Sequence, residues 1–293
     1  MTLEQLRIFV AVAEREHVTQ GARDLNLTQS ATSAAIAALE TRYATKLFDR
    51  VGRRIALTEA GRLFLVEARA VLARAAAAEA TLFDLAGLEC GSLSIAASQT
   101  VGNYWLPPIL HRYRTLYPKI AIELKICNTL TAADMARAGV VDFAIVEGEI
   151  CDTSLAIEPV ARDELKLVTF PGHPWTRAKP KQADDYRSAN WVLREKGSGT
   201  RAIFEAVLGQ FGVDAAELRI ALELPTHEAV AAAVAAGAGV AMLPSLIAEA
   251  SAGTLAPLDI PLPNRRFLAL RREGRHITHA ALAFRALLQP GSP

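Results

Sequence analysis

From Leu3 to about Ala86, apolar residues recur with the spacing of an α-helix. Two sets of positions define the first two predicted helices: Leu3, Leu6, Phe9, Val10 and Ala13 in the first, and Val18, Ala22 and Leu25 in the second. A third helix is predicted to begin at Gln29, and strong helix formers predict a long helix through the Ala-rich stretch Ala68 to Gly87. The first part of the chain is therefore expected to be almost entirely helical.

After Gly87 the pattern changes to short apolar segments that alternate with amphipathic ones. Segments with the length of strands are SLSIAA, IAIELKIC, VDFAIV, ELKLVTF, NWVLRE, IALEL and GVAMLP. Segments with helical spacing between them are YWLPPILHRYRTLY, TAADMARAG, TRAIFEAVLGQF and EAVAAAVAAG. Strands separated by helices predict an α/β fold of parallel sheets with helices packed on both faces.

Two segments indicate that this α/β region forms two lobes. EPVARDELKL leads from the first group of strands to the second, and PLPNRRFLALRR followed by the helix THAALAFRALL supplies a return pass. We expect the crossings near Ala161 and Arg265. Lobe I then comprises residues 91–161 and 266–293, and lobe II comprises residues 162–265.

The composition is that of a protein with sizeable cores and little excess charge. Of the 293 residues, 51% are hydrophobic, which predicts two or three domains with buried cores. A net charge of +1 argues against coating nucleic acid through bulk charge, so any such contact is expected to be local. Cys90, Cys127 and Cys151 are far apart and contain no CxxC pair, which predicts neither a disulfide framework nor a zinc cluster.

The chain shows no pattern of export or membrane insertion. Its first residues lack the basic-then-apolar order of a secretory signal. The longest apolar run, Ala229 to Leu246, is interrupted by glycines and a proline and falls short of the ~20 strongly apolar residues of a membrane span. We expect a cytoplasmic protein.

The third predicted helix, within TQSATSAAIAALE, carries small polar residues on a face where Lys and Glu are usual. We expect Ala31, Thr32, Ile36, Leu39 and Tyr43 on its inner side and Gln29, Ser30, Ser33, Ala34 and Ala37 on its outer side. Thr28 is suited to cap its N-terminus. Gln can bind an adenine edge, Ser can contact bases or phosphates, and small side chains allow close approach. An Ala/Ser-rich helix standing alone is most often only a surface helix.

The segment after it, KLFDRVGRRIALTEAG, favours the DNA-binding interpretation. It contains two strand-like pieces joined by a glycine turn that carries three arginines. A basic hairpin beside the second helix of a helix-turn-helix would hold the DNA backbone, and its binding would weaken with added salt. The expected DNA-binding residues of this winged helix are Thr28, Gln29, Ser30, Ser33, Arg50, Arg53 and Arg54.

The order of these motifs resembles the LysR-type transcriptional regulators. The similar segments are LRIFVAVAE, ARDLNLTQSATSAAIAALE, KLFDR and ALTEAG, and the α/β region that follows is similar to the effector domain of that family. The resemblance implies a winged helix-turn-helix, a linker helix and a two-lobed effector domain like the type II periplasmic binding proteins. His17 and Ala34 depart from the residues that the family often has at those positions.

The resemblance also implies a division of the chain and an assembly. The expected domains are residues 1–58 for promoter DNA binding, 59–87 for the linker and dimerisation helix, and 88–293 for effector binding. Members of the family pair through their linker helices, so double-stranded promoter DNA and a second copy of the chain, in a homodimer or homotetramer, are the implied partners.

Two hydroxyl-rich turns suggest a ligand site in the α/β region. LREKGSGTRAIFE runs from a strand through Gly197, Ser198, Gly199 and Thr200 into a helix, and Arg201 is expected to add charge. A second strand leads through Ser98, Gln99 and Thr100 into a helix. In open α/β sheets ligands bind beyond the carboxyl ends of strands, so the two turns are expected to face one another across the cleft.

The resemblance adds further residues and a class of ligand to this site. It implies that Asn128 or Thr129, Glu147, and His227 after Thr226 also line the pocket, although Glu147 could instead hold a hinge and His227 could instead cap a helix. The segments ASQTVGNYWLP and REKGSGTR are similar to the family branch of carbon dioxide fixation and sulfite metabolism. That branch suggests a small oxyanion or a phosphorylated metabolite as effector.

Other classes of protein are less well supported. A solute-binding receptor or a cytoplasmic small-anion-binding protein without promoter specificity would need only the C-terminal region. An enzyme lacks support because GxSxG and P-loop motifs are absent, and no cofactor is predicted. The pair His276 and His279 in HITH has no nearby Cys or carboxylate cluster and is interpreted as solvated surface rather than as a metal site.

Overall fold

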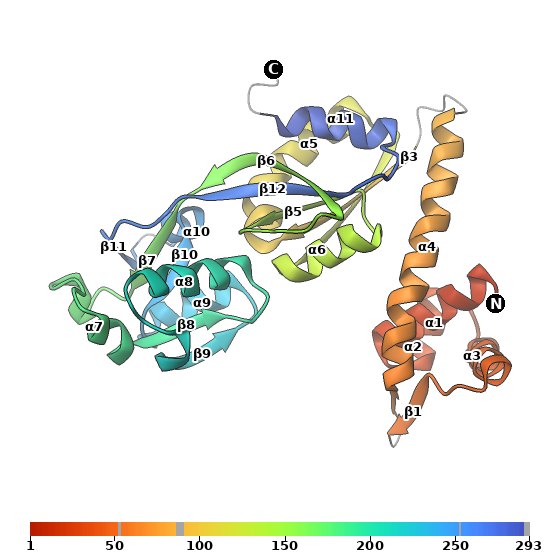
Figure 1. Ribbon diagram of the computed structural model, residues 1–293, viewed down its shortest axis with the longest axis horizontal. Coiled ribbons are helices and arrows are strands. Elements are labelled where there is room, and N and C mark those ends of the chain that lie inside the picture. The colour runs from red at the N-terminus through yellow and green to blue at the C-terminus, as the bar shows by residue number, and fades with distance from the viewer. Residues whose placement is uncertain (52–53, 86–90, 252, 290–293) are drawn as a thin grey trace. The chain divides into compact units, whose positions relative to one another are not determined.

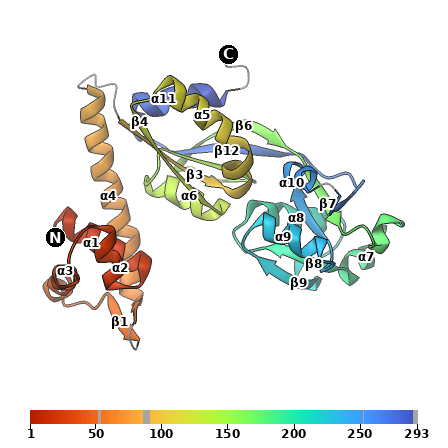
Figure 2. The same cartoon turned by 180° about the vertical axis from the view of Figure 1, so that it is seen from behind.

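The computed structural model describes residues 1–51, 54–85, 91–251 and 253–289. The chain forms two compact units, one within Met1–Gly87 and the other within Leu88–Arg137 and Val141–Pro293 (Figure 1 and Figure 2). The N-terminal unit is mainly helical, and the C-terminal unit contains two α/β lobes.

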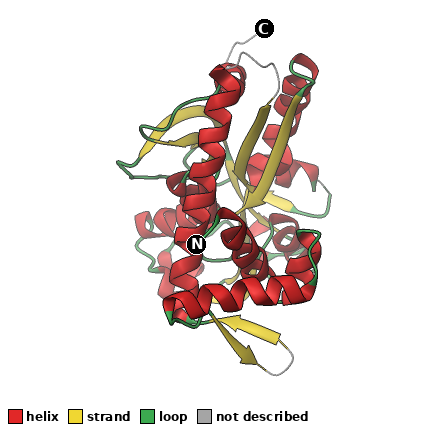
Figure 3. Ribbon diagram, turned by 90° about the vertical axis from the view of Figure 1, so that its right-hand side faces the viewer, coloured by secondary structure: helices red, strands yellow, loops and turns green. Residues whose placement is uncertain are grey.

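The N-terminal unit consists of four helices and a two-stranded antiparallel sheet. Its elements are α1 (Leu3–Arg15), α2 (Val18–Asp24), α3 (Gln29–Tyr43), β1 (Phe48–Val51), β2 (Arg54–Leu57) and α4 (Glu59–Leu85). Figure 3 shows β1 and β2 as a hairpin that extends from the helices. This order of elements is the winged helix-turn-helix followed by a long helix that the sequence predicts.

Aromatic packing and one carboxylate hold the N-terminal unit together. The Phe9 ring lies 5.5 Å from the ring of Phe48 and 4.8 Å from that of Phe64, so α1, β1 and α4 share one core. Glu40 on α3 accepts hydrogen bonds from the backbone N–H groups of Leu47, at 2.8 Å, and Phe48, at 3.2 Å. Burial opposes the charged form of Glu40, but these bonds, together with the hydrogen bond and the positive charge of Lys46, outweigh it and lower its pKa. The charged carboxylate therefore ties the hairpin to α3.

Lobe I is a five-stranded sheet between two layers of helices. Its elements are β3 (Gly91–Ser98), the π-helical turn η1 (Val101–Trp105), α5 (Leu106–Leu116), β4 (Ile120–Cys127), α6 (Thr129–Ala138), β5 (Phe143–Glu147), β6 (Leu155–Asp163), β12 (Arg265–Arg272) and α11 (His279–Leu288). The strand order is β4-β3-β5-β12-β6. Alternate residues of each central strand face opposite layers, as period-two geometry requires.

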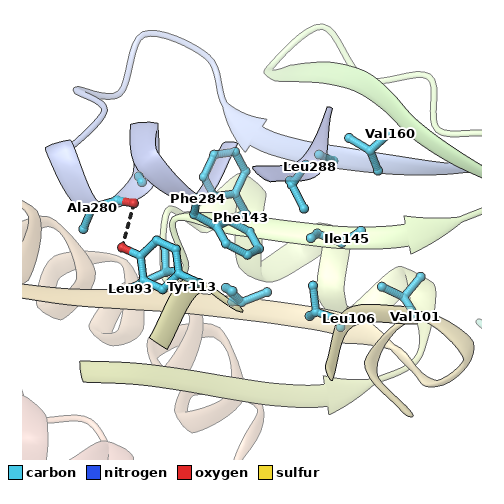
Figure 4. Packing of buried hydrophobic residues seen from close by; sticks show 14 of the residues in the cluster. Leu93, Val101, Leu106, Tyr113, Phe143, Ile145, Val160, Ala280, Phe284 and Leu288 are labelled. Atoms are coloured by element: carbon cyan, nitrogen blue, oxygen red, sulfur yellow. Dashed lines mark hydrogen bonds between the residues drawn. The ribbon is translucent and has the colours of Figure 1, made fainter. Parts of the chain in front are cut away.

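One face of this sheet is covered by α5 and α11. Figure 4 shows its packing, in which Phe143 and Ile145 of β5 contact residues of both helices, and Tyr113 donates a hydrogen bond of 2.9 Å to the Ala280 carbonyl. The other face is covered by α6, whose small residues Ala132 and Ala136 allow close packing. Both faces of the central strands are therefore buried.

Lobe II is built in the same way from the middle of the C-terminal unit. Its elements are β7 (Leu165–Thr169), the 3-10 turn η2 (Pro174–Thr176), α7 (Ala183–Ser188), β8 (Asn190–Arg194), α8 (Gly199–Gln210), the 3-10 turn η3 (Ala215–Glu217), β9 (Arg219–Leu224), α9 (His227–Ala235), β10 (Ala241–Pro244), α10 (Ser245–Ala250) and β11 (Ala256–Leu258). The strands form β10-β7-β11 and β8-β9, joined by a bridge between Trp191 and Val240. One core lies toward α8 and the other toward α9 and α10.

The sheets are mixed rather than parallel, which corrects the prediction. β3, β4 and β5 are parallel, as the helices between them require, but β12 runs antiparallel to β5 and β6, and both β10 and β11 run antiparallel to β7. In lobe I the return pass of the chain explains the difference, because β12 re-enters lobe I from lobe II and runs against the strands already there. The alternation of strands and helices along the sequence does not reveal the direction in which this strand runs.

The two lobes are connected by β6 and β12, which run side by side (Figure 1). β6 pairs within the lobe I sheet as far as Asp163, and β12 pairs in it from Arg265. The register shifts between Phe267 and Leu268, whose partners are Ala161 and Pro159. Val160 is thus the extra residue of a β-bulge in β6.

Within the part of the chain that the structure describes, none of the helices is both long enough and apolar enough to cross a membrane.

Gly61, in the first turn of α4, is expected to be required by the N-terminal unit. A Cβ atom there would lie 2.1 Å from the Leu47 carbonyl oxygen and 2.9 Å from the Leu57 side chain. Gly61→Ala should destabilise this unit by about 2 kcal/mol, because backbone must move to make room. Faster hydrogen exchange of the α1 and α4 amides would report the loss.

Gly209→Ala is the matched control, because a Cβ atom at Gly209 meets nothing within 4 Å and the position is helical. It should leave exchange unchanged or slow it slightly. Equal protection of α1 in Gly61→Ala and in the unchanged protein would contradict the expected strain.

Candidate functional site

The outer face of α3 is exposed and polar at its N-terminal end. Thr28 caps the helix, since its hydroxyl accepts a hydrogen bond of 3.2 Å from the Ala31 N–H, and it also lies 3.1 Å from the Ser30 hydroxyl. Gln29, Ser30 and Ser33 are all exposed. The three side chains are therefore free to contact a ligand of the size of DNA.

Fewer residues on the inner face of α3 are buried than predicted. Thr32, Ile36 and Leu39 are buried as expected, and Ala34 and Ala37 lie on the exposed side. Ala31 and Tyr43, which were expected on the inner side, are exposed, with Tyr43 at 51%. Ala31 lies in the first turn and Tyr43 is the last residue, so neither reaches the layer formed by α1.

Only some of the arginines predicted for the hairpin lie within the described residues. Arg50 on β1 is exposed and lies opposite Ile55 of β2. Arg54 pairs with Val51 through its backbone, and Arg53 lies outside the described residues. The antiparallel pairing itself agrees with the predicted wing.

In the C-terminal unit, the two hydroxyl-rich turns meet at the junction of the lobes. Thr100 follows β3 of lobe I, Thr200 lies in the first turn of α8 in lobe II, and both are buried. The same guanidinium binds both hydroxyls: Arg265 donates to Thr200 at 2.8 Å and to Thr100 at 3.1 Å. The two turns therefore face one another, as the topology of the strands predicts.

Arg265 lies at the centre of the site, buried in the hinge. Its guanidinium donates to Asp163, with an Nε to carboxylate distance of 2.8 Å, and lies 3.6 Å from a carboxylate oxygen of Glu147. Asp163 is also its cross-strand partner, because the β-bulge at Val160 sets β12 and β6 in that register. A buried charge is tolerated only when it is paired and hydrogen-bonded, and Arg265 meets both conditions.

His227 bridges the same two turns from the start of α9. Its Nε2 lies 3.2 Å from the Thr100 hydroxyl and 3.4 Å from the Thr200 hydroxyl, and the side chain is fully buried. Burial, with a smaller contribution from the positive charges of Arg194 and Arg265, holds the pKa of His227 well below its ordinary value of 6.5. The imidazole is therefore neutral at physiological pH.

Further contacts close the lobes around this centre. Ser98 donates a hydrogen bond to the buried Glu147 carboxylate. Gln99 donates to the Pro225 carbonyl at 3.0 Å and accepts from the His227 N–H at 3.2 Å. These contacts place Ser98, Gln99, Glu147 and His227 of the predicted pocket together.

The start of α6 also reaches the start of α8. Thr129 accepts a hydrogen bond of 3.2 Å from the Gly199 N–H and donates to the Glu147 carbonyl. A Cβ atom at Gly199 would lie 2.3 Å from that carbonyl oxygen, so only glycine allows this approach of the lobes. Asn128 caps α6 through the Thr131 N–H and lies beside Gly197.

Arg201 does not supply a free positive charge to the cleft. It forms ion pairs with Glu205, at 2.8 Å, and with Glu223, and it donates to the Arg194 carbonyl. The expectation of added charge from Arg201 is therefore wrong in this arrangement. The guanidinium that contacts both hydroxyl-rich turns is that of Arg265.

Two polar atoms in the site lack a partner. Within the described part of the chain, the Ser198 hydroxyl and His227 Nδ1 are buried and make no hydrogen bond. An unsatisfied buried polar atom is uncommon because it costs desolvation energy. Both atoms therefore retain an unused capacity for a hydrogen bond.

Arg265, Asp163 and Arg194 are site residues that sequence reasoning missed. Arg265 and Asp163 lie in the two segments predicted to cross between lobes, NRRF and VARD, and opposite charges at both crossings were the available signal. Whether Arg265 faces the acid depends on the bulge, which has no sequence signature.

No metal site accompanies the cleft in the described ranges, where no group of three or more His, Cys, Asp or Glu side chains could hold an ion. His276 and His279 are exposed. Cys127 and Cys151 are free thiols, and Cys90 lies outside the described residues.

A winged helix with an exposed reading helix, joined to two lobes with a polar junction, defines a DNA-binding regulator with a ligand-binding domain. Residues 3–62 match the family model "Bacterial regulatory helix-turn-helix protein, lysR family", and residues 86–292 match "LysR substrate binding domain". The chain belongs to the LysR family of transcriptional regulators. The predicted family and fold class are thereby confirmed.

Curated relatives cover the whole chain. An "Uncharacterized HTH-type transcriptional regulator YeiE" of Escherichia coli (strain K12) is 34% identical over 296 residues, which cover 100% of this chain and 98% of that protein. A "Probable RuBisCO transcriptional regulator" of Trichormus variabilis is 33% identical over 296 residues, covering 99% of this chain and 88% of that one.

Solved structures show the same architecture. CbnR, a LysR family transcriptional regulator, superposes with a TM-score of 0.70 at 22% identity, covering 98% of each chain. The CcmR regulatory domain of Synechocystis PCC6803, in complex with 2-PG, gives a TM-score of 0.61 at 27% identity, covering 68% of this chain and 95% of that one.

Acid should destabilise the C-terminal unit through His227. Because its pKa in the folded state lies below the unfolded value, the unfolded chain alone takes up the proton as pH falls below about 6.5. The free energy of unfolding should then fall by up to ~1.4 kcal/mol per pH unit from this group. Urea unfolding followed by tryptophan fluorescence at pH 7.5, 6.5 and 5.5 measures it.

The free energy of unfolding of His227→Gln should depend less steeply on pH than that of the unchanged protein. The variant His276→Gln, at an exposed position, should behave like the unchanged protein. Parallel pH dependences for all three proteins would mean that His227 takes up a proton in the folded state.

Proposed function

We propose that the chain binds promoter DNA through α3 and the basic hairpin, and that a small anion in the cleft of the C-terminal unit modulates this binding. The DNA contacts are assigned to Thr28, Gln29, Ser30, Ser33, Arg50, Arg53 and Arg54. The exposure of Gln29, Ser30 and Ser33 beside a capped helix start supports this assignment.

The main support for the effector site is that residues from both lobes contact Arg265. Its guanidinium binds a hydroxyl from each lobe, so a ligand that competes for this group acts on both lobes at once. The residues assigned to the pocket are Ser98, Gln99, Thr100, Asn128, Thr129, Glu147, Gly197, Ser198, Gly199, Thr200 and His227, with Arg265 added and Arg201 acting through its ion pairs.

The free donors at α8 favour an oxyanion or a phosphorylated metabolite. Ser198 precedes the N-terminus of α8, where backbone N–H groups and the helix dipole attract negative charge, and its hydroxyl makes no hydrogen bond among the described residues. Asp163 and Glu147 already balance Arg265, so an anion must displace a carboxylate or bind at the start of α8. The 2-PG complex of the CcmR domain supports the same class of ligand.

Ligand control then follows from differential binding. Thr100 and Thr200 are held at hydrogen-bond distance from one guanidinium in the closed arrangement. An anion that binds this arrangement better than an open one shifts the population toward it, and only this difference in affinity can change DNA binding.

The long helix α4 is proposed to join two copies of the chain. Leu63, Val66 and Leu82 on α4 are 68%, 60% and 68% exposed. Exposed large apolar side chains along one helix mark a surface that another protein covers. We assign residues 59–87 to this dimerisation helix, residues 1–58 to DNA binding and residues 88–293 to effector binding. We further propose that the protein is a cytoplasmic homodimer or homotetramer without catalytic activity.

Replacement of the α3 contacts should reduce promoter affinity. Gln29→Ala and Ser33→Ala should each weaken binding about tenfold, since a good base contact contributes roughly 1–3 kcal/mol of discrimination. Gel-shift titrations would use a fragment selected from genomic DNA and a random fragment of equal length. Thr41→Ala, an exposed position at the other end of α3, is the control.

Equal affinity of the unchanged protein for both fragments would remove promoter recognition and leave a small-anion-binding protein. Retained preference in both α3 variants would instead place the reading residues elsewhere.

Replacement of Ser198 should separate ligand binding from folding. Because its buried hydroxyl has no partner among the described residues, Ser198→Ala should leave the melting temperature without ligand unchanged or raise it slightly. It should reduce the stabilisation by sulfate, phosphate or 2-PG, with about tenfold weaker binding from one lost hydrogen bond to a charged group.

A thermal-shift titration of the full chain provides the measurement, with Ser251→Ala in lobe II as the control. Equal stabilisation of Ser198→Ala and the unchanged protein by each anion would place the ligand away from the start of α8.

A further inference from the structure

The exposed face of the reading helix α3 carries no charge over most of its length. The stretch QSATSAAIAA, from Gln29 to Ala38, contains no Arg, Lys, Asp or Glu. Within it only Thr32 and Ile36 are buried and Ala35 is half-buried, so the other residues face outward. A surface helix normally presents charged residues to water. This face therefore differs from an ordinary solvated one.

The two charged side chains of α3 follow this stretch and are engaged elsewhere. Glu40 is bound to Lys46 and to the backbone of the hairpin. The Arg42 guanidinium lies 5.7 Å from the centre of the Tyr43 ring, and its spacing of five residues from Ala37 places it on another side of the helix. Arg and Lys recognise guanine through two parallel hydrogen bonds. The uncharged face of α3 has no side chain that can make this contact.

Few hydrogen-bonding side chains remain on the uncharged face. The Ser30 hydroxyl lies 3.1 Å from the hydroxyl of Thr28, which itself caps the helix. Gln29 and Ser33 are the other exposed polar residues of the stretch. The amide of Gln29 has the geometry to bind the edge of adenine, and a serine hydroxyl can contact several bases. The rest of the face consists of methyl groups.

Ala34 and Ala37 supply methyl groups beside these polar residues. Residues 30, 34 and 37 follow the spacing i, i+4 and i+7, so they share one side of the helix, and all three are exposed. An alanine side chain ends at Cβ, so it can touch a base only if the helix backbone comes close to the groove. The apolar group that bases present in the major groove is the 5-methyl group of thymine.

We propose that α3 recognises thymine by its 5-methyl group, which lies against the Cβ atoms of Ala34 and Ala37, while Gln29 binds adenine. The two residues are then determinants of specificity, and the half-sites that α3 selects are rich in A·T pairs. Phosphate contacts and their salt dependence come from arginines outside this face, such as the exposed Arg50. The inference rests on the proposed binding of promoter DNA through α3 and adds the chemistry by which bases are distinguished.

The test uses the full chain and duplexes that it selects from a random-sequence library. At each thymine of a selected half-site, four duplexes carry thymine, uracil, cytosine or 5-methylcytosine, each with its complementary base. Uracil differs from thymine, and cytosine from 5-methylcytosine, only in the methyl group. Where α3 contacts a thymine, uracil should weaken binding about fourfold, as expected for one buried CH₂ group, and 5-methylcytosine should bind better than cytosine by a similar factor. Gel-shift titrations measure the four affinities.

Ala34→Gly and Ala37→Gly remove the methyl group from the protein side of the contact. At the thymine concerned, each variant should bind thymine and uracil duplexes equally, because the contact needs both methyl groups. Ala35→Gly is the matched control, since Ala35 packs toward the core of the N-terminal unit, and it should keep the preference for thymine. Any general loss of helix stability affects both duplexes alike and cancels in the ratio.

The outcomes separate this inference from the proposed function. Equal affinity for thymine and uracil at every position, with the selected duplex still preferred over random DNA, would overturn the methyl contact and leave promoter recognition intact. A preference for thymine that persists in both glycine variants would place the contact on another part of the protein. Failure of the unchanged protein to enrich any sequence from the library would remove the proposed DNA recognition itself.

Discussion

Arg265 and Asp163 form a buried ion pair between the two strands that connect the lobes, and much of the effector domain is arranged around it. A buried guanidinium is stable only if its donors and its charge are satisfied. Here Asp163 supplies the charge, while Thr100 and Thr200 supply hydroxyls from opposite lobes. The relative position of the lobes is thereby tied to the hydrogen bonding of a single side chain.

This constraint gives the domain a means of responding to a ligand. His227 lies against the same two hydroxyls but cannot carry a charge there, since burial and two nearby arginines disfavour its protonated form. The site is thus close to electrostatic balance without ligand. An anion disturbs that balance, and the contacts that restore it involve both lobes. Because both lobes take part, ligand binding is coupled to domain geometry.

The sequence predicts the elements better than it predicts their directions and charges. Helical spacing located α1 and α3, and the rule for strand ends placed Thr100 and Thr200 in one site, because both depend on local periodicity and chain order. The antiparallel course of β12 and the role of Arg265 depend on how distant strands pair. Arg201 looked like a free charge because one of its partners, Glu223, comes from β9, although the other, Glu205, lies four residues along the same helix.

The β-bulge at Val160 has a consequence for how this hinge tolerates change. If β6 kept all its residues but paired with β12 without this bulge, the register of Pro159 with Leu268 would continue and set Arg265 against Arg162, so that two positive charges would share the interior where an acid now stands. The irregularity in the backbone at Val160, rather than any side chain that contacts the guanidinium, therefore decides which residue of β6 faces Arg265.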